Sequence, residues 1–296
     1  MSRTESPARL AVRKTYKLYI GGAFPRSESG RSYAVTSSKG EFLANASRAS
    51  RKDARDAVAA ARKAFGGWSG ATPYNRGQIL YRIAEMLEGR RAQFAAELAD
   101  AGTKSPGDVV DAAVDRLVWY AGWSDKIAAV AGAANPVAGP YLNISSPEPT
   151  GVVAVVAPDD PLLGLVSVVA PVIVTGNTCV VVASERAPLP AVTLAEVLAT
   201  SDLPGGVVNI LTGSVKEIAP WLAGHMDVNA LDLAGVSDPG LAVACEEAAA
   251  ENLKRVLRPA PADRAADWAA DWAADPGTRR LTAFLETKTV WHPTGI

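Results

Sequence analysis

The stretch Gly151-Val-Val-Ala-Val-Val-Ala157 is an apolar run typical of a strand that is buried on both faces of a sheet. Two similar runs follow, Thr178-Cys-Val-Val-Val-Ala183 and Val207-Val-Asn-Ile-Leu211. Helices are predicted between and after these runs, from Pro161, over 190–198 and over 215–223. Strands that alternate with helices predict an α/β fold, in which helices cover both faces of a parallel sheet.

The sequence before this sheet predicts helices. Leu18-Tyr-Ile-Gly-Gly-Ala-Phe24 indicates a short strand and turn, and Ser50 is the expected N-cap of a helix from about Arg51. Helices then dominate to about Val130, and each is expected to place an apolar stripe in the core. The stripe over 75–88 consists of Ile79, Leu80, Ile83, Met86 and Leu87, and a similar pattern spans 91–100.

The segment 132–151 separates these helices from the first strand of the sheet. It is rich in Gly, Pro, Ser and Asn, and its stretch Tyr141-Leu-Asn-Ile-Ser145 alternates in the manner of a strand. We interpret the segment as a projecting hairpin, with an ordinary linker as the alternative.

Composition excludes several classes of function. The chain has 296 residues, 48% of them hydrophobic, and a formal net charge of -1, so neither nucleic acid nor an anionic membrane surface is an expected partner. The most apolar stretch, 151–174, is interrupted by Pro158, Asp159, Asp160, Pro161 and Pro171, which argues against a membrane span. The N-terminus has no segment of signal-peptide type, and we expect a cytoplasmic protein.

Cysteine and histidine give no metal-binding pattern. The cysteines are Cys179 and Cys245, and the histidines, His225 and His292, lie far apart in the sequence. Cys179 lies within an apolar strand and Cys245 within a predicted helix over 240–252, so packing is the expected role of both thiols.

A parallel sheet binds ligands at the carboxyl ends of its strands. No Gly-x-Gly-x-x-Gly motif follows a predicted strand here, and Gly235-Val-Ser-Asp-Pro-Gly240 is a weak signal, because glycine is also common in strand-to-helix turns. Asp159 and Asp160 form a pair of the residue type used in acid–base chemistry. Adjacent carboxylates before a proline at a helix start more often cap the helix, and we favour that role.

Five phrases resemble the aldehyde dehydrogenase superfamily, in its order and spacing. They are Glu148-Pro-Thr-Gly-Val152, Ala170-Pro-Val-Ile-Val-Thr-Gly-Asn-Thr178, Leu203-Pro-Gly-Gly-Val-Val-Asn-Ile-Leu-Thr-Gly213, Asn252-Leu-Lys-Arg-Val256 and Phe284-Leu-Glu-Thr-Lys-Thr-Val-Trp-His-Pro293. The resemblance implies a Rossmann-type cofactor domain with N-terminal helices, an oligomerisation hairpin and a C-terminal assembly strand.

The sequence departs from the family pattern at positions to which the resemblance assigns catalysis or cofactor contacts. Pro259 stands at the position of the family's general-base glutamate, and no cysteine follows it. Asp159 lies in the phrase that carries the family's oxyanion-holding asparagine, and a carboxylate there would repel an oxyanion. Val182 replaces a ribose-contacting lysine, and Val236 replaces the serine of the pyrophosphate turn. The resemblance therefore implies an absent catalytic domain.

Some cofactor positions are retained. The resemblance assigns cofactor contacts to Glu185, Gly213, Gly235 and Gly240, and implies that NAD or NADP binds weakly or not at all. Each residue also has a structural interpretation, because Glu185 can cap a strand end and the glycines can serve tight turns.

The chain is most similar in plan to the second, noncatalytic module of the two-module aldehyde dehydrogenases of family sixteen. This similarity implies five parts: helices of the cofactor-type domain (1–131), an oligomerisation hairpin (132–150), a Rossmann-like domain (151–258), a connector in place of the catalytic domain (259–280) and an assembly strand (281–296). Trp268 and Trp272, in a tandem Ala-Ala-Asp-Trp repeat, are expected to share one face of a short helix and cover apolar surface.

Three hypotheses of function remain open. The first is a noncatalytic subunit that stabilises or regulates a full-length aldehyde dehydrogenase, or associates with itself, through 132–150 and 284–292. The second is an NAD(P)-dependent aldehyde dehydrogenase, which requires Cys179 or Cys245 as nucleophile. The third is a noncatalytic NAD(P)-binding module.

Overall fold

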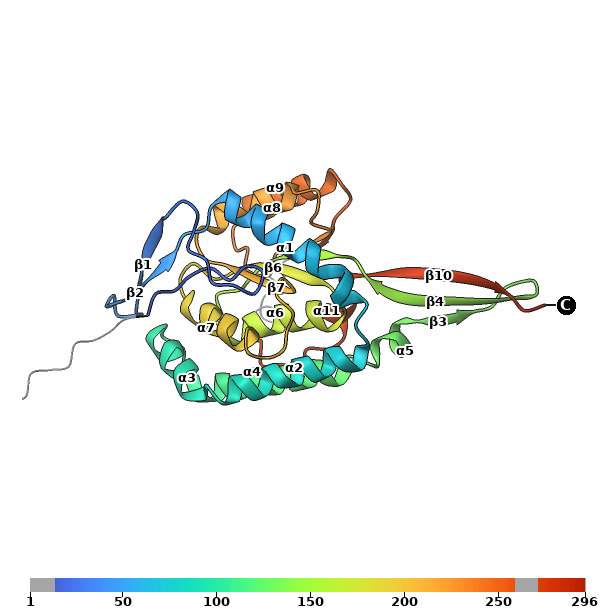
Figure 1. Cartoon of the computed structure of the whole chain (residues 1–296), viewed down its shortest axis with the longest axis horizontal. Helices are drawn as coiled ribbons and strands as arrows, with labels where there is room; N and C mark the ends of the chain where they lie inside the picture. Colours follow the sequence, from blue (N-terminus) through green and yellow to red (C-terminus); the bar gives the residue numbers. More distant parts are fainter. Residues whose placement is uncertain (1–13, 259–270, 296) are drawn as a thin grey trace, which may run out of the picture.

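The computed structural model describes residues 14–258 and 271–295 and confirms the predicted α/β fold. Its centre is a five-stranded parallel sheet in the order β7-β6-β5-β8-β9 (Figure 1). The strands are β5 (Val152–Val156), β6 (Thr178–Val182), β7 (Val208–Leu211), β8 (Ala230–Asp232) and β9 (Arg255–Leu257). The three predicted apolar runs form β5, β6 and β7, and all residues of these strands are buried.

Alternate residues of each strand pack on opposite faces of the sheet, as the two-residue period of a strand requires. Val153 and Cys179 belong to the hydrophobic core on one face, and Ala154 and Val180 to the core on the other. The first face is covered by α6 (Leu163–Val174) and α7 (Leu189–Leu198), the second by α1 (Arg51–Ser69), α8 (Val215–Gly224) and α9 (Pro239–Ala250) (Figure 1). Burial on both sides explains why the strand sequences are apolar throughout.

The predicted N-terminal helices form a further layer outside α6. They are α2 (Pro73–Glu88), α3 (Arg91–Asp100), α4 (Pro106–Trp123) and the short α5 (Ile127–Ala131). The apolar stripe predicted over 75–88 is confirmed, because Leu80, Ile83 and Leu87 are almost fully buried. None of the helices within 14–258 and 271–295 is both long and apolar enough to cross a membrane.

Helix α1 begins at the predicted N-cap. The Ser50 hydroxyl accepts a hydrogen bond from the Asp53 backbone N–H (3.3 Å), and the Asp53 carboxylate accepts one from the Ser50 N–H (2.8 Å). This reciprocal capping box satisfies two backbone donors that the first turn of a helix leaves unpaired.

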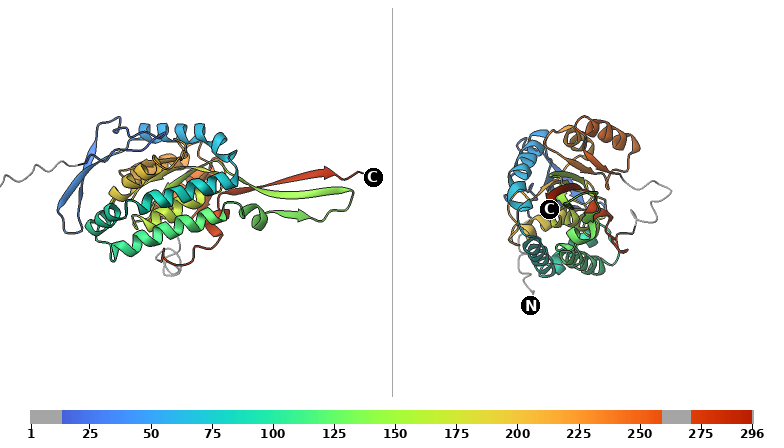
Figure 2. Two further views of the ribbon diagram at one scale, coloured as in Figure 1. Left: turned by 60° about the horizontal axis from the view of Figure 1, so that its bottom comes forward. Right: turned by 90° about the vertical axis from the view of Figure 1, so that its right-hand side faces the viewer.

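An antiparallel three-stranded arm extends from this body (Figures 1 and 2). It contains β3 (Ala133–Asn135), β4 (Tyr141–Pro149) and β10 (Leu285–Pro293) in the order β10-β4-β3. The predicted hairpin and tail strand are both confirmed, and the linker interpretation is wrong. Strand β10 pairs with β4 along its whole length, from Leu285 opposite Pro149 to Pro293 opposite Tyr141.

The arm is fastened to the sheet at the residue before β10. The carbonyl oxygen of Phe284 accepts hydrogen bonds from the Thr150 N–H (3.2 Å) and from the Asn177 side-chain amide (3.0 Å). The amide oxygen of Asn177 accepts from the Gly151 N–H (2.9 Å). The buried Asn177 side chain thus joins the start of β5 to the root of the arm.

The N-terminal part also contains a hairpin that the sequence did not predict, β1 (Ser32–Thr36) and β2 (Phe42–Ser47). The strand predicted over 18–24 is reduced to isolated bridges. Tyr19 exchanges backbone hydrogen bonds with Ile210 (2.9 and 2.8 Å), so this segment covers the outer edge of β7.

Residues 271–284 contain the described end of the predicted connector (259–280) and are called the connector from here on. They lead to the arm through the short helix α11 (Arg279–Thr282). Trp272 lies in a turn rather than in the predicted short helix, but it is buried in the same core as α6, so it covers apolar surface as predicted. Trp268 and Pro259 lie outside the described residues. Arg280 of the connector pairs with Asp232 at the end of β8 (2.5 Å), and both side chains are buried.

Candidate functional site

The predicted cofactor residues lie in segments that follow the carboxyl ends of parallel strands. Glu185 follows β6, Gly213 follows β7, and Gly235 follows β8. Gly240 lies in the first turn of α9, the next helix, and Asp159 follows β5. Because parallel strands end at one edge of their sheet, these segments share the edge at which such folds bind ligands. The assignment of these residues to a cofactor stays a prediction.

Glu185 and Asp159 line one open hollow of about 450 Å³ at this edge, together with Arg186 and Tyr33. The Asp159 carboxylate accepts a hydrogen bond from the Ser184 hydroxyl (2.7 Å) and lies 3.8 Å from Arg186. Both members of that ion pair are exposed, so water screens it and it contributes little stability. The hollow therefore presents two carboxylates to one exposed guanidinium.

Asp160 caps α6, as favoured from the sequence. Its carboxylate accepts hydrogen bonds from the backbone N–H groups of Leu162 (3.3 Å) and Gly164 (2.8 Å). These are the donors that a helix start could otherwise offer to an anion. Asp159 has a different role, since it contacts Ser184 rather than the helix.

Asp238 caps the start of α9. Its carboxylate accepts hydrogen bonds from the N–H groups of Gly240 (3.0 Å) and Leu241 (3.4 Å), and its other oxygen lies 3.6 Å from Lys216. The helix start that the family resemblance assigns to a pyrophosphate is thus capped by a carboxylate of the chain itself. A phosphate at this position would meet negative charge and already bonded donors.

Packing and backbone conformation require glycine at two of these positions, Gly235 and Gly213. A Cβ atom on Gly235 would lie 2.0 Å from the Ala157 carbonyl oxygen, so no other residue fits between β5 and β8 there. Gly213 has φ +130°, a conformation that L side chains rarely adopt, and packs against the backbone N of Ala49. Both glycines therefore support the turn interpretation, whatever they bind.

The substituted positions Val182 and Val236 are both buried and belong to the apolar core. Neither side chain can donate a hydrogen bond to a ribose or a phosphate. Taken with Asp160 and Asp238, they make this edge a poor fit for the pyrophosphate and ribose of a dinucleotide.

Neither thiol is suited to nucleophilic attack. Cys179 is fully buried in β6, and burial raises the pKa of its thiol far above the ordinary value. Cys245 is buried in α9, where burial and then Glu246 raise its pKa to about 11. Both stay protonated at neutral pH, whereas the thiolate is the nucleophile. Within the described residues, no group of His, Cys, Asp and Glu could hold a metal ion.

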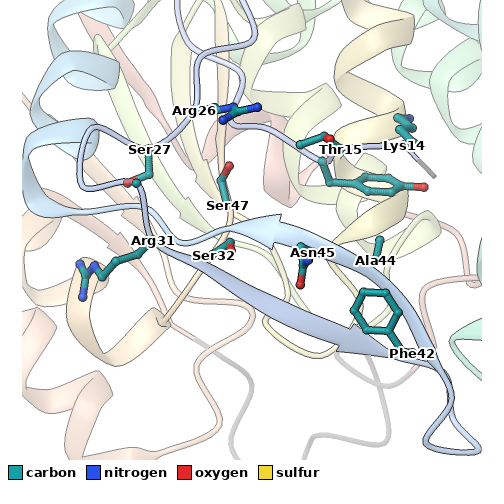
Figure 3. A pocket seen from close by; sticks show the side chains of 12 residues that line it. Lys14, Thr15, Arg26, Ser27, Arg31, Ser32, Phe42, Ala44, Asn45 and Ser47 are labelled. Carbon is teal, nitrogen blue, oxygen red and sulfur yellow. The ribbon is translucent and has the colours of Figure 1, made fainter. Parts of the chain in front are cut away.

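Sequence reasoning missed the contribution of the N-terminal hairpin to this region. Burial raises the pKa of Tyr33, on β1, and the nearby Glu185 carboxylate raises it further. A second hollow of about 360 Å³ lies over the hairpin, where Lys14, Arg26 and Arg31 contribute to the lining (Figure 3). Lys14 is paired with Glu196 (2.8 Å) and Arg31 with Glu217 (3.2 Å). No motif could reveal these residues, because the hairpin itself was not predicted.

Comparison with known proteins is consistent with the resemblance in the sequence. The sequence model of the aldehyde dehydrogenase family matches residues 24–260. The chain is 33% identical over 250 residues to the putative aldehyde dehydrogenase DhaS of Bacillus subtilis (strain 168), across 82% of this chain and 50% of the relative. It is 33% identical over 260 residues to cytosolic 10-formyltetrahydrofolate dehydrogenase of Mus musculus, across 84% of this chain and 28% of the relative. The chain thus spans half the length of the first relative and less of the second.

Solved structures give the same result. An NAD+ complex of aldehyde dehydrogenase from Bacillus cereus superposes with a TM-score of 0.77 at 28% identity, over 82% of this chain and 50% of that one. PnpE in complex with nicotinamide adenine dinucleotide superposes with a TM-score of 0.77 at 30% identity, over 81% of this chain and 50% of that one.

Proposed function

Because the chain belongs to the aldehyde dehydrogenase family, we propose that it is a noncatalytic member that assembles with a full-length aldehyde dehydrogenase and stabilises or regulates it. The observation that carries the proposal is the complete arm. Strand β10 pairs with β4 over nine residues, although β9 ends at Leu257 and β10 begins at Leu285. The intervening residues contain no cysteine. In this proposal, the interval around 259–280 stands in place of a catalytic domain, as in the second module of family sixteen.

The surface of the arm supports assembly. Ile144 of β4 pairs with Val290 of β10, and Leu142 lies on the same face, two residues along the strand. Their side chains are 45–51% exposed. A small sheet with exposed apolar side chains gains stability from packing against a further layer. A dehydrogenase subunit that covers this face would supply that layer.

The site at the carboxyl edge supports the noncatalytic part of the proposal. Asp160 and Asp238 bond the helix starts, and the exposed Asp159 stands where the resemblance places the oxyanion-holding side chain. A preformed negative charge destabilises a developing oxyanion, so this edge of the sheet would not stabilise the transition state of acyl transfer. NAD or NADP, when bound, would supply a hydride acceptor, but the residues present do not fit its pyrophosphate.

A turnover measurement tests the noncatalytic part. The purified chain is incubated with NAD or NADP and with aliphatic and aromatic aldehydes, and absorbance of the reduced nicotinamide is followed. We expect no turnover. Turnover that disappears in Cys179→Ala or Cys245→Ala would establish the alternative, a catalytic aldehyde dehydrogenase, and overturn the proposal. The buried, protonated state of both thiols disfavours that alternative.

A noncatalytic NAD(P)-binding module is the second candidate. It is favoured by the NAD complexes among the similar structures and by Glu185, which lines the hollow at the carboxyl edge. Calorimetry with NAD and NADP distinguishes the two candidates. Saturable heat that is lost in Glu185→Gln would support the second, whereas absence of binding at millimolar cofactor would remove it. A cytoplasmic location stays a prediction under either candidate.

A further inference from the structure

A small open cavity lies between the connector and the helices α4 and α6. Its volume is about 170 Å³, and its lining includes Arg116 and Tyr120 of α4, Ser167 of α6, and Trp272 and Arg280 of the connector. The family match ends at residue 260, so one wall of this cavity is built by a segment outside the match. On a scale of about 30 Å³ for each liquid water, the cavity has room for about five waters or a small molecule.

Arg116 gives this cavity a positive charge that no carboxylate of the described residues contacts. Arg116 is 8% exposed. Its guanidinium donates hydrogen bonds to the Ser167 hydroxyl (3.1 Å) and to the carbonyl oxygens of Trp272 (2.7 Å) and Ala274 (2.8 Å). All three acceptors are neutral, and within the described residues Arg116 forms no ion pair with a carboxylate. A buried charge is normally paired with an opposite one, since desolvation without a counter-charge is costly.

Two further buried side chains of the lining are Arg280 and Tyr120. Arg280 is a second buried guanidinium, and it pairs with the buried Asp232 carboxylate. Tyr120 is fully buried, and burial raises its pKa to about 12, so its hydroxyl keeps its proton. That hydroxyl lies 3.5 Å from the Ser167 carbonyl oxygen, at the outer limit of a hydrogen bond, and beside the Arg116 guanidinium.

Carboxylates at the rim do not cancel this charge. Asp271 and Asp275 also line the cavity, but both are exposed. Each accepts a hydrogen bond from its own segment, Asp271 from the Ala273 N–H (3.1 Å) and Asp275 from the Gly277 N–H (3.0 Å). Water screens exposed charges more than buried ones, so these two carboxylates offset the charge of Arg116 less than a buried carboxylate would.

We propose that this cavity binds a small anion, a carboxylate or phosphate group, with Arg116 as its principal partner. The proposal is independent of the proposed function, because it concerns the connector rather than the carboxyl edge of the sheet. Since Trp272, Ala274 and Arg280 belong to the connector, a bound anion would also hold the connector against α4 and α6.

Thermal unfolding of the full chain tests this site. Chloride is replaced by propionate or by phosphate at constant ionic strength, in the wild type, in Arg116→Met and in Arg82→Met. Arg82 is an exposed arginine of α2 that pairs with Glu85, so its variant controls for loss of one positive charge and for general salt effects. At an anion concentration of roughly 100 times the Kd, we expect the midpoint temperature of unfolding to rise by about 5 °C in the wild type and in Arg82→Met. It should stay unchanged in Arg116→Met.

The outcomes separate the sources of the anion. If only propionate raises the unfolding midpoint, the site binds carboxylates. If only phosphate raises it, the site binds phosphates. If both raise it, the site accepts either kind of anion. Absence of a shift, or an equal shift in Arg116→Met, overturns the proposal. If Arg116→Met does not fold, tryptophan fluorescence of the wild type is titrated with each anion and compared with Trp272→Phe. A saturable change that is missing in Trp272→Phe supports the site, and no change in the wild type overturns it.

Discussion

Asp159, Asp160 and Asp238 show what residue types alone reveal about a site. Helix-capping chemistry predicted the role of Asp160 correctly, because a carboxylate before a helix start is the nearest acceptor for its free N–H groups. The same chemistry did not predict that Asp159 would contact Ser184, which lies after a different strand. That contact depends on how parallel strands β5 and β6 are placed side by side. A single residue is therefore predictable where its partners are local in sequence.

Replacing Asp238 should measure how firmly α9 is capped by its own carboxylate. Asp238→Ala removes the acceptor for Gly240 and Leu241, and loss of such an N-cap costs about 1 kcal/mol in free energy of unfolding. Asp238→Asn keeps an acceptor oxygen and should cost only about a few tenths of that, because the exposed pair with Lys216 contributes little. Urea unfolding of both variants checks the prediction. Equal losses would show that charge, rather than capping, is what Asp238 provides.

Elements with a strong period or a local cap were predictable, and those defined by tertiary pairing were not. Helix α3 has the predicted bounds, Arg91–Asp100, and α1 begins after Ser50 as predicted. Strand β8 has three residues, too few for a periodic pattern, and ends in the buried Asp232. That carboxylate can be buried because Arg280, far along the chain, pairs with it. A sequence pattern alone does not reveal such a partner.

The Asp232–Arg280 pair should behave as the fastening of the connector to the sheet. Arg280→Met leaves the Asp232 carboxylate buried without its counter-charge, and breaking a buried pair in this way costs about 3–5 kcal/mol. The double variant Asp232→Ala Arg280→Met removes both charges and should recover most of that loss. Urea unfolding of the wild type, the two single variants and the double variant gives the coupling energy. Additive losses would mean that the two residues do not act as a pair.

At the scale of the whole molecule, a body of conventional α/β construction carries an arm that has no second layer of its own. The family match and the similar structures account for the body, and at its carboxyl edge Asp238 bonds the start of α9 with its own carboxylate. The arm was predictable from the alternation in 141–145 and from the tail phrase, since strand patterning survives without a core. The packing of the connector was not, because it depends on contacts such as Arg116 with Trp272.

Assembly through the arm is the property on which the proposed function depends. Ile144→Lys with Val290→Lys places two charges on the exposed aliphatic face, and burying a side chain of this size contributes about 1.5–3 kcal/mol. The Kd for a full-length aldehyde dehydrogenase of the same organism should therefore rise by more than about tenfold. Sedimentation of mixtures of the two proteins measures this Kd. The two lysines would lie directly opposite each other on β4 and β10 and weaken that pairing slightly, so the melting temperature of the variant is measured beside the Kd.

The matched control for this experiment is Asn75→Lys with Gln78→Lys, which adds the same charge to exposed positions of α2, outside the arm. It should bind the dehydrogenase as the wild type does. Equal weakening by the two double variants would indicate a general charge effect. Undiminished binding by the arm variant, with its melting temperature unchanged, would mean that a partner contacts another surface, and the arm would then lose its role in the proposed function.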